Sequence, residues 1–480
     1  MTTATHNHSH SLNRFAVIPT AVRLNADPFY AGNAVTIAFL DSGFYPHPDI
    51  ADRILAYHDL NDEQSSLDPN APVSSWQWHG TQTSVVAAGD GQLSQGTYCG
   101  LAKKANLVLV KVSHQGSISE EDIARGIEWV IAHREQHNIR ILSISLGGDQ
   151  DVSCTRSIID QAAERAIETG ITVVAAAGNS GHEGRHSLPP ANSPSVITVG
   201  GYNDNNRLDS ESRDLYHSNF GATADGTLKP EIIAPAMWVA APILPNTGAF
   251  DRAEALSELA AAPDFLLPTL ARELSDAAKL TKGLTGAGAS MIRQHVDETL
   301  KLLKIVAAHY QHVDGTSFAA PIVASVIAQM IEANPRLTPG AIKDILVSTA
   351  TRIGNVAAIR QGYGVVNAAR AVELARHETH PLNVRGCSPP RMEDGRLVFV
   401  YHDDYADHVA VAGEFNGWDH QGLPLRKDEN GLWHVEAQSP GAGRYQYKFV
   451  VNGHRWTEDP SNGMKVPDNF GGLNSLLVIE

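Results

Sequence analysis

A glycine turn that leads directly into an apolar helix is the feature that most constrains this chain. Residues 312–321 have the sequence His-Val-Asp-Gly-Thr-Ser-Phe-Ala-Ala-Pro, and the apolar run 322–330 follows at once. Gly315 permits a tight turn, Ser317 falls at the start of the predicted helix, and small residues let that helix pack closely against its neighbours. Most serines in such runs are only helix caps, so Ser317 needs supporting residues before it can be interpreted as a nucleophile.

Two earlier segments place an ionisable side chain at a similar glycine turn. Residues 36–43 are predicted to form a buried strand that ends on Asp41, the position at which open α/β sheets present ligand-facing side chains. His79 lies in segment 78–88, where a glycine turn again opens a helix of small residues. Each residue alone is a common turn or cap residue. Together they supply an orienting carboxylate, a base and a nucleophile.

In the chain order Asp, His, Ser, these segments resemble the catalytic segments of the subtilisin-like serine proteases, the subtilases. The chymotrypsin-like and α/β-hydrolase enzymes have other orders. The resemblance covers roughly residues 30–375 and implies an α/β fold with a mostly parallel sheet flanked by helices. Further matching blocks lie at residues 143–148, 173–179, 194–200, 218–221, 229–235 and 362–368.

The resemblance implies a serine endopeptidase with Asp41, His79 and Ser317 as catalytic residues. A serine hydroxyl is a poor nucleophile at neutral pH, so His79 would accept its proton and later deliver that proton to the leaving amine. Asp41 would hold the imidazole in the required tautomer and stabilise its cation. Asn179 matches the side chain that, with the backbone N–H of Ser317, stabilises the oxyanion.

The resemblance also implies residues that bind substrate. Ser145, Leu146 and Gly147 match the strand edge that pairs with an extended peptide backbone. Leu188 is placed near the floor of the pocket for the residue that precedes the cut, which favours small side chains there. The chain departs from the family at Gln82, where a second histidine is usual, but that position has no role in the triad.

Between the predicted strand near 237–243 and the serine segment, subtilases have a short loop, whereas this chain has about 70 residues. We predict that this insertion, about 245–310, is helical. Asp251 is predicted to cap a helix over 252–261, a second helix is expected near 263–280, and a third follows a glycine-rich break. The third has one apolar face made of Ile292, Val296, Leu300, Leu303 and Val306.

Two roles for the insertion remain open at this point. It precedes the serine segment directly, so one hypothesis is a lid or gate that restricts which proteins enter the cleft. The other is a helical decoration or an oligomer contact, and the oligomeric state is not predicted.

After a predicted linker at 379–391, the pattern changes to short strands separated by Gly, Asn and Pro turns, which indicates an immunoglobulin-like β-sandwich at 392–480. This part resembles the glycogen-binding module of the AMP-activated protein kinase β subunit (carbohydrate-binding module family 48). Phe470 and Gly472 depart from that family. The resemblance is carried by residues 413–418, 423–425, 443–449 and 456–460.

Trp418 and Trp456 would be the stacking platforms for glycogen or another α-glucan, because sugar rings have apolar faces. Lys448 and Asn474 match the family's polar contacts. The alternative for each tryptophan is core packing, which fits Trp433 in its alternating strand.

The composition of the chain limits its number of domains, its binding partners and its location. The 480 residues, 42% of them hydrophobic, are enough for two domains, which we place at 31–378 and 392–480, after an N-terminal extension at 1–30. A net charge of −16 and a pI near 5.7 argue against nucleic-acid or anionic-membrane binding. We see no signal peptide or bilayer-spanning run, so a cytoplasmic location is expected. Only 40 residues precede Asp41, so no room for the N-terminal pro-domain of exported subtilases is expected.

No cofactor is required for this chemistry. The alternating His6, His8 and His10 are interpreted as a polar tail, and the widely spaced Cys99, Cys154 and Cys387 suggest neither disulfides nor a thiolate metal site. Structural calcium is left open, because Asp49 lies where subtilases have a carboxylate ligand but its partner ligands are not recognisable.

The leading hypothesis is a serine endopeptidase that acts on proteins or peptides and is targeted to glycogen or a similar α-glucan. A catalytically quiet glucan-binding scaffold is the alternative. A glucan-acting enzyme ranks last, because no paired acid and nucleophile carboxylates are recognisable beside the module.

Overall fold

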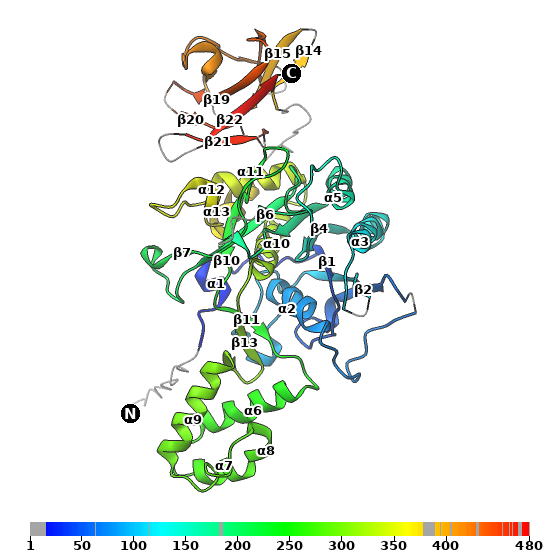
Figure 1. The fold of residues 1–480 in the computed structure, drawn as a ribbon, viewed down its shortest axis with the longest axis vertical. Coiled ribbons are helices and arrows are strands. Elements are labelled where there is room, and N and C mark those ends of the chain that lie inside the picture. Colours follow the sequence, from blue (N-terminus) through cyan, green and yellow to red (C-terminus); the bar gives the residue numbers. More distant parts are fainter. Residues whose placement is uncertain are drawn as a thin grey trace, which may run out of the picture.

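The computed structural model describes residues 16–377 and 389–479, except residues 63, 115, 182–185, 394, 404–405, 429–431, 454, 460, 463 and 469–472. Figure 1 shows an α/β domain in the middle of the molecule, a lobe of helices at one end and an all-β domain at the other. The predicted helical insertion forms the lobe.

The α/β domain is built on a sheet with the strand order β10-β6-β5-β4-β1-β3-β2, in which all neighbours on this path are parallel. The predicted parallel sheet is therefore confirmed. A short strand, β7 (Asp214–Leu215), pairs antiparallel with β6. The other strands are β1 (Thr36–Asp41), β2 (Ile54–Asp59), β3 (Asn106–Lys111), β4 (Ile139–Ile144), β5 (Thr172–Ala176), β6 (Ile197–Asn203) and β10 (Ile232–Pro235).

Helices cover both faces of this sheet, which explains why its central strand is a continuous apolar run. In β1, Ile37 and Phe39 face one core while Ala38 and Leu40 face the other. The first core also contains residues of α2 (Gln77–Ala88), α10 (Thr316–Ala333), α11 (Pro339–Thr349) and α13 (Ala368–His377). The second contains residues of α3 (Glu120–Ala132) and α5 (Ile158–Glu168). Smaller elements are α4 (Arg134–His137), β8 (Gly221–Ala222), β9 (Leu228–Lys229) and α12 (Ala358–Gln361).

Helix α10 has the length and apolarity of a membrane span, contrary to the expectation that no segment would. However, 83% of its apolar window is buried inside the α/β domain, as in the core helix of a soluble protein. Its apolar residues are therefore explained by packing.

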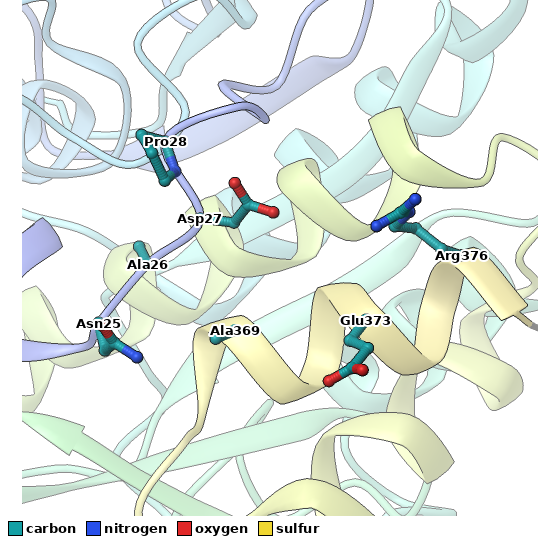
Figure 2. Close-up of a pocket in the computed structure, with 7 residues that line it drawn as sticks. All are labelled: Asn25, Ala26, Asp27, Pro28, Ala369, Glu373 and Arg376. Atoms are coloured by element: carbon teal, nitrogen blue, oxygen red, sulfur yellow. The ribbon is translucent and has the colours of Figure 1, made fainter.

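Residues 16–30, which we predicted as an extension, pack on the α/β domain. The short helix α1 (Thr20–Arg23) carries Arg23, whose buried guanidinium lies 2.6 Å from Asp204 and also donates to the carbonyls of Met237 and Trp238. His6, His8 and His10 lie outside the described residues. Figure 2 shows a pocket between this N-terminal segment and α13; none of the predicted site residues lines it. Its lining is Asn25, Ala26, Asp27, Pro28, Ala369, Glu373 and Arg376.

The helical lobe has an apolar core of its own and stands on a three-stranded sheet. Its helices are α6 (Gly248–Ala261), α7 (Leu267–Glu273), α8 (Ser275–Ala278) and α9 (Ala289–Leu302). The sheet beneath it has the order β11-β13-β12, formed by β11 (Val239–Pro242), β12 (Ile305–Ala307) and β13 (Tyr310–Val313). The insertion therefore leaves from β11 and returns through β12 and β13.

Two boundaries predicted for the lobe are wrong. The cap of α6 is Thr247, whose hydroxyl accepts from the N–H of Phe250, so Asp251 lies inside the first turn. Helix α9 ends at Leu302 because Lys304 takes a left-handed conformation with φ 58°. Leu303 caps that helix, and Val306 lies in β12, where it joins a separate apolar cluster.

The C-terminal domain consists of two antiparallel sheets around an apolar core, as predicted. Trp433 is 6% exposed within that core. One sheet contains β14 (Arg391–Glu393), β15 (Arg396–His402), β17 (Arg426–Lys427) and β18 (Leu432–Gln438). The other contains β16 (Val409–Gly413), β19 (Gly443–Val451), β20 (Arg455–Thr457), β21 (Lys465–Pro467) and β22 (Leu473–Ile479).

This domain contacts the α/β domain directly. Thr227 forms an antiparallel bridge with Met464, and the guanidinium of Arg352 lies 3.4 Å from the carboxylate of Glu458. Most of the predicted linker lies outside the described residues. The two domains are thus joined by packing as well as by the chain that connects them.

Candidate active site

The carboxyl end of β1 and the first turn of α2 bring Asp41 and His79 together. The Nδ1–H of His79 lies 2.8 Å from Oδ1 and 2.9 Å from Oδ2 of Asp41. Asp41 is 1% exposed, and it also accepts from the N–H of Ser42 at 2.7 Å and from the hydroxyl of Thr83 at 3.3 Å. These donors fix the orientation of a buried carboxylate that faces the imidazole.

The charge of Asp41 raises the pKa of His79, and burial of the imidazole opposes that effect. A nearby carboxylate favours the protonated imidazole, which is the form that follows proton abstraction from a nucleophile. The two turns can approach this closely because residue 80 is glycine. A Cβ at Gly80 would lie 2.4 Å from the carbonyl of Gly43 and 2.8 Å from the Cβ of Asp41.

Ser317 lies in the first turn of α10, next to the elements that carry the other two residues. Gly315 caps the helix with φ 140°, a conformation that favours glycine. The backbone carbonyl of Ser317 accepts from the hydroxyl of Ser145 at 2.9 Å, and the ring of Phe318 lies 6.0 Å from that of His79. The three predicted triad residues therefore lie on three elements that meet at the carboxyl end of the central strands β1 and β4.

Asn179 is fixed beside this serine turn. Its Oδ1 accepts from both the N–H and the hydroxyl of Thr316 at 2.9 Å. Because a backbone N–H can only donate, this contact assigns Oδ1 and leaves the Nδ2 donor facing elsewhere. A Cβ at Gly315 would lie 3.8 Å from that Nδ2. The Nδ2 donor is therefore close to Gly315, in the turn that precedes Ser317. His217 supports the same loop through its Nδ1, 2.7 Å from the carbonyl of Asn179.

The predicted substrate-binding segments lie side by side. Ser145 and Leu146 are half-buried and Gly147 is exposed just beyond β4. The N–H of Gly148 donates to the carbonyl of Pro189 at 2.8 Å, which places the half-buried Leu188 next to this edge.

Gln82, which stands where subtilases usually have a second histidine, has a structural role. Gln82 is 6% exposed, and its Nε2 donates to the carbonyl of Pro242 at 3.0 Å. Pro242 is the last residue of β11, from which the helical lobe leaves. Sequence reasoning missed this role, because the partner lies 160 residues away.

The carboxylate of Asp49, the residue that left calcium open, is occupied by hydrogen bonds within the protein. It is fully buried, and its oxygens accept from the hydroxyl of Tyr310 and the N–H of Leu93. Calcium requires six to eight oxygen ligands. Within the described part of the chain, no group of three or more His, Cys, Asp or Glu residues could hold a metal ion. Burial raises the pKa of Asp49, which further disfavours a free carboxylate there.

The C-terminal domain brings its predicted residues together: Lys448, Trp456 and Asn474 lie on one sheet, and Trp418 lies in the turn that follows β16. Trp456 is 43% exposed, and its ring lies 6.4 Å from that of the half-buried Trp418. His420, which sequence reasoning missed, lies 6.3 Å from Trp456 and could have been noticed as an aromatic residue two positions after Trp418. Trp456 pairs with Val450 across β19 and β20, and Lys448, two residues earlier, therefore shares its face.

The polar residues of this face already have protein partners. The ammonium of Lys448 lies 2.6 Å from Asp468, and the Nδ2 of Asn474 donates to Gln446 at 2.8 Å. Phe470 and Gly472 lie outside the described residues. We call the group made of Trp418, His420, Lys448, Trp456 and the buried Asn474 the aromatic face.

Comparison with known proteins shows the family of the α/β domain. Residues 32–365 match the subtilase family model. The chain belongs to the subtilase family. Residues 385–461 match carbohydrate-binding module 48, the isoamylase N-terminal domain.

Two curated relatives are themselves subtilases. Serine protease AprX from Bacillus subtilis is 32% identical over 354 residues, 71% of this chain and 66% of the relative. Subtilisin NAT from Bacillus subtilis subsp. natto is 28% identical over 349 residues, 72% of this chain and 67% of the relative. The matched part thus spans about two thirds of the length of these proteins. A solved protease from Pseudoalteromonas arctica has a TM-score of 0.49 at 24% identity, covering 75% of this chain and 95% of its own.

Proposed function

We propose that this subtilase is a serine endopeptidase in which Ser317 is the nucleophile, His79 the general base and Asp41 its orienting partner. The observation that carries the proposal is the paired contact between the imidazole of His79 and the buried carboxylate of Asp41. Such a pair holds the Nδ1–H tautomer and leaves Nε2 to accept a proton from a hydroxyl.

The reaction then follows from the positions of these groups. Ser317 Oγ attacks the scissile carbonyl as His79 takes its proton, and the resulting imidazolium is stabilised by Asp41. The Nδ2 donor of Asn179 and the backbone N–H of Ser317 stabilise the oxyanion. His79 returns the proton to the leaving amine, and water then hydrolyses the acyl-enzyme by the same route. The edge at Ser145, Leu146 and Gly147 would pair with the extended substrate backbone.

A fluorophosphonate probe tests the nucleophile. We expect wild-type protein to be labelled at Ser317, and a Ser317→Ala variant not to be labelled. The Ser348→Ala variant is a matched control and should be labelled like the wild type, because the Ser348 hydroxyl lies on α11 and donates to the carbonyl of Ile345 in its own helix. Absence of labelling in wild-type protein would favour the glucan-binding scaffold instead.

We further propose that the aromatic face binds glycogen or a similar α-glucan, so that proteolysis acts on proteins located there. Support comes from an exposed indole beside a second indole, with polar side chains on the same sheet. Co-sedimentation with glycogen tests this function separately from catalysis. Ser317→Ala protein should still sediment, and failure of wild-type protein to sediment would contradict glucan targeting.

A further inference from the structure

Trp78, the residue that precedes His79 in the chain, contacts the helical lobe although it lies in the α/β domain. Trp78 lies in the first turn of α2, is half-buried and packs against the apolar core of the lobe. That core includes Leu256 of α6 and Val296 of α9. A side chain adjacent to the catalytic base is therefore anchored in the insertion.

A second contact ties the same helix to the base of the lobe. Gln82 follows Trp78 by four positions, so both side chains lie on one side of α2. The Nε2 of Gln82 donates to the carbonyl of Pro242, at the end of β11. Asn246, four residues further on, donates to the carbonyl of Pro69 at 2.7 Å, in the segment that leads to α2.

The lobe itself is firmly attached at its return strands. The N–H of Ile243 donates to the carbonyl of His309 at 2.9 Å, and the His309 ring stacks on Phe250 of α6 with 4.5 Å between ring centroids. Tyr310, the next residue, donates its hydroxyl to the buried Asp49. The first two contacts join the two ends of the insertion to each other, and the third ties its return strand to the α/β domain.

The start of α2 is held by backbone and side-chain contacts from several segments. The first N–H groups of a helix have no partner within it, and a capping side chain usually satisfies one of them. Here the cap position is Trp76, which makes no side-chain capping bond, and the N–H groups of Gln77 and Trp78 instead donate to the carbonyls of Ser74 and Ser75 at 3.1 and 3.5 Å. Gln77 provides one tie, through its Nε2 to the carbonyl of Phe44 at 2.8 Å. Packing of Trp78 on the lobe adds an apolar contact to this hydrogen bond.

We propose that the helical lobe positions the catalytic base: Trp78, docked in the lobe core and reinforced by Gln82, holds the first turn of α2 so that His79 faces Asp41 and Ser317. Trp78 is a positioning residue. The inference rests on the proposed protease function and differs from the gate hypothesis, because it makes the lobe necessary for small substrates as well as for proteins.

The test measures kcat, KM and the pH dependence of kcat/KM for full-length Trp78→Ala on a short fluorogenic peptide. We expect kcat to fall about 10- to 100-fold with KM little changed, since a displacement of about 1 Å has such an effect on catalysis. The acid limb of kcat/KM should move to lower pH, because a looser contact with Asp41 raises the His79 pKa less. Trp78→Phe should restore most of the activity.

Trp129→Ala is the matched control for loss of a half-buried indole, because Trp129 lies on α3 and stacks on His58 and His133, away from α2. It should lower Tm without changing kcat or the acid limb. Gln82→Met is a second variant that keeps the helix packed and removes only the donor to Pro242; we expect a several-fold fall in kcat.

The possible outcomes separate the hypotheses. An active wild type with unchanged kcat in Trp78→Ala and Gln82→Met would overturn the positioning role alone. Faster cleavage of a folded protein with an unchanged rate on the peptide would support a gate instead. If the wild type neither cleaves peptide nor reacts with the fluorophosphonate probe, the protease function fails, and this inference fails with it.

Discussion

The candidate catalytic cluster, made of Asp41, His79 and Ser317, and the aromatic face are assembled in opposite ways. At the catalytic cluster, Asp41 is 1% exposed and held by donors from α2 and from its own turn, so its geometry is set before substrate arrives. On the aromatic face, Trp456 is 43% exposed, and Lys448 is paired with Asp468. The first arrangement is suited to stabilising a transition state, whereas the second must exchange polar partners when a ligand binds.

The largest effect is expected when the charge at the catalytic cluster is removed. Asp41→Asn should lower kcat about 10⁴-fold, the size known for this substitution in a serine-protease triad. Because Asp41 raises the His79 pKa and activity requires the neutral imidazole, the acid limb of kcat/KM should also move to lower pH. A pH profile on a peptide substrate measures both. An acid limb in the same place would mean that Asp41 does not control His79.

The oxyanion donor comes next in size. Asn179→Ala should lower kcat about 100- to 1000-fold with KM nearly unchanged, a magnitude known from subtilisin itself. The physical reason is that the Nδ2 donor acts on charge that develops only in the transition state. His217→Phe is a control that removes the imidazole contact to the Asn179 carbonyl while leaving the donor in place. A rise in KM with kcat unchanged would contradict the oxyanion role.

A smaller effect is expected on the aromatic face. Trp456→Ala should weaken glycogen binding about tenfold or more, as is usual for a tryptophan at the centre of a binding surface. Co-sedimentation over a range of glycogen concentrations gives the apparent Kd. Cleavage of a soluble peptide should stay at the wild-type rate. Unchanged glycogen binding would show that this face is not the glucan site.

The smallest effect concerns the lysine of that face. Lys448→Met should weaken glycogen binding about two- to fivefold, because one hydrogen bond contributes little net free energy when its donor already has a partner. Asp468→Asn should have the opposite or no effect, since it frees the ammonium. If Lys448→Met weakens glycogen binding as much as Trp456→Ala does, the paired ammonium contributes as much as the exposed indole, which contradicts this prediction.

The sequence by itself predicted which local segments hold the candidate catalytic residues. Glycine turns beside apolar runs, together with the resemblance to subtilases, predicted the neighbourhoods of Asp41, His79 and Ser317 and the parallel sheet that holds them. These signals are local: a positive φ at Gly315 and a buried strand at Thr36–Asp41 depend on residues close in the chain. The ends of helices were harder to predict from the sequence. Thr247 and Asp251 are both acceptable caps, and only the backbone conformation shows that Thr247 is the cap.

Only the tertiary structure decided which distant groups meet. The partner of Gln82 is a carbonyl 160 residues away, and Asp49 is satisfied by Tyr310, 261 residues away, so neither role has a sequence pattern. The same is true of Trp78, whose local sequence does not show that it packs in the core of the insertion. Hydrogen-bond donors and apolar surfaces find partners wherever packing brings them together, and that depends on the whole fold.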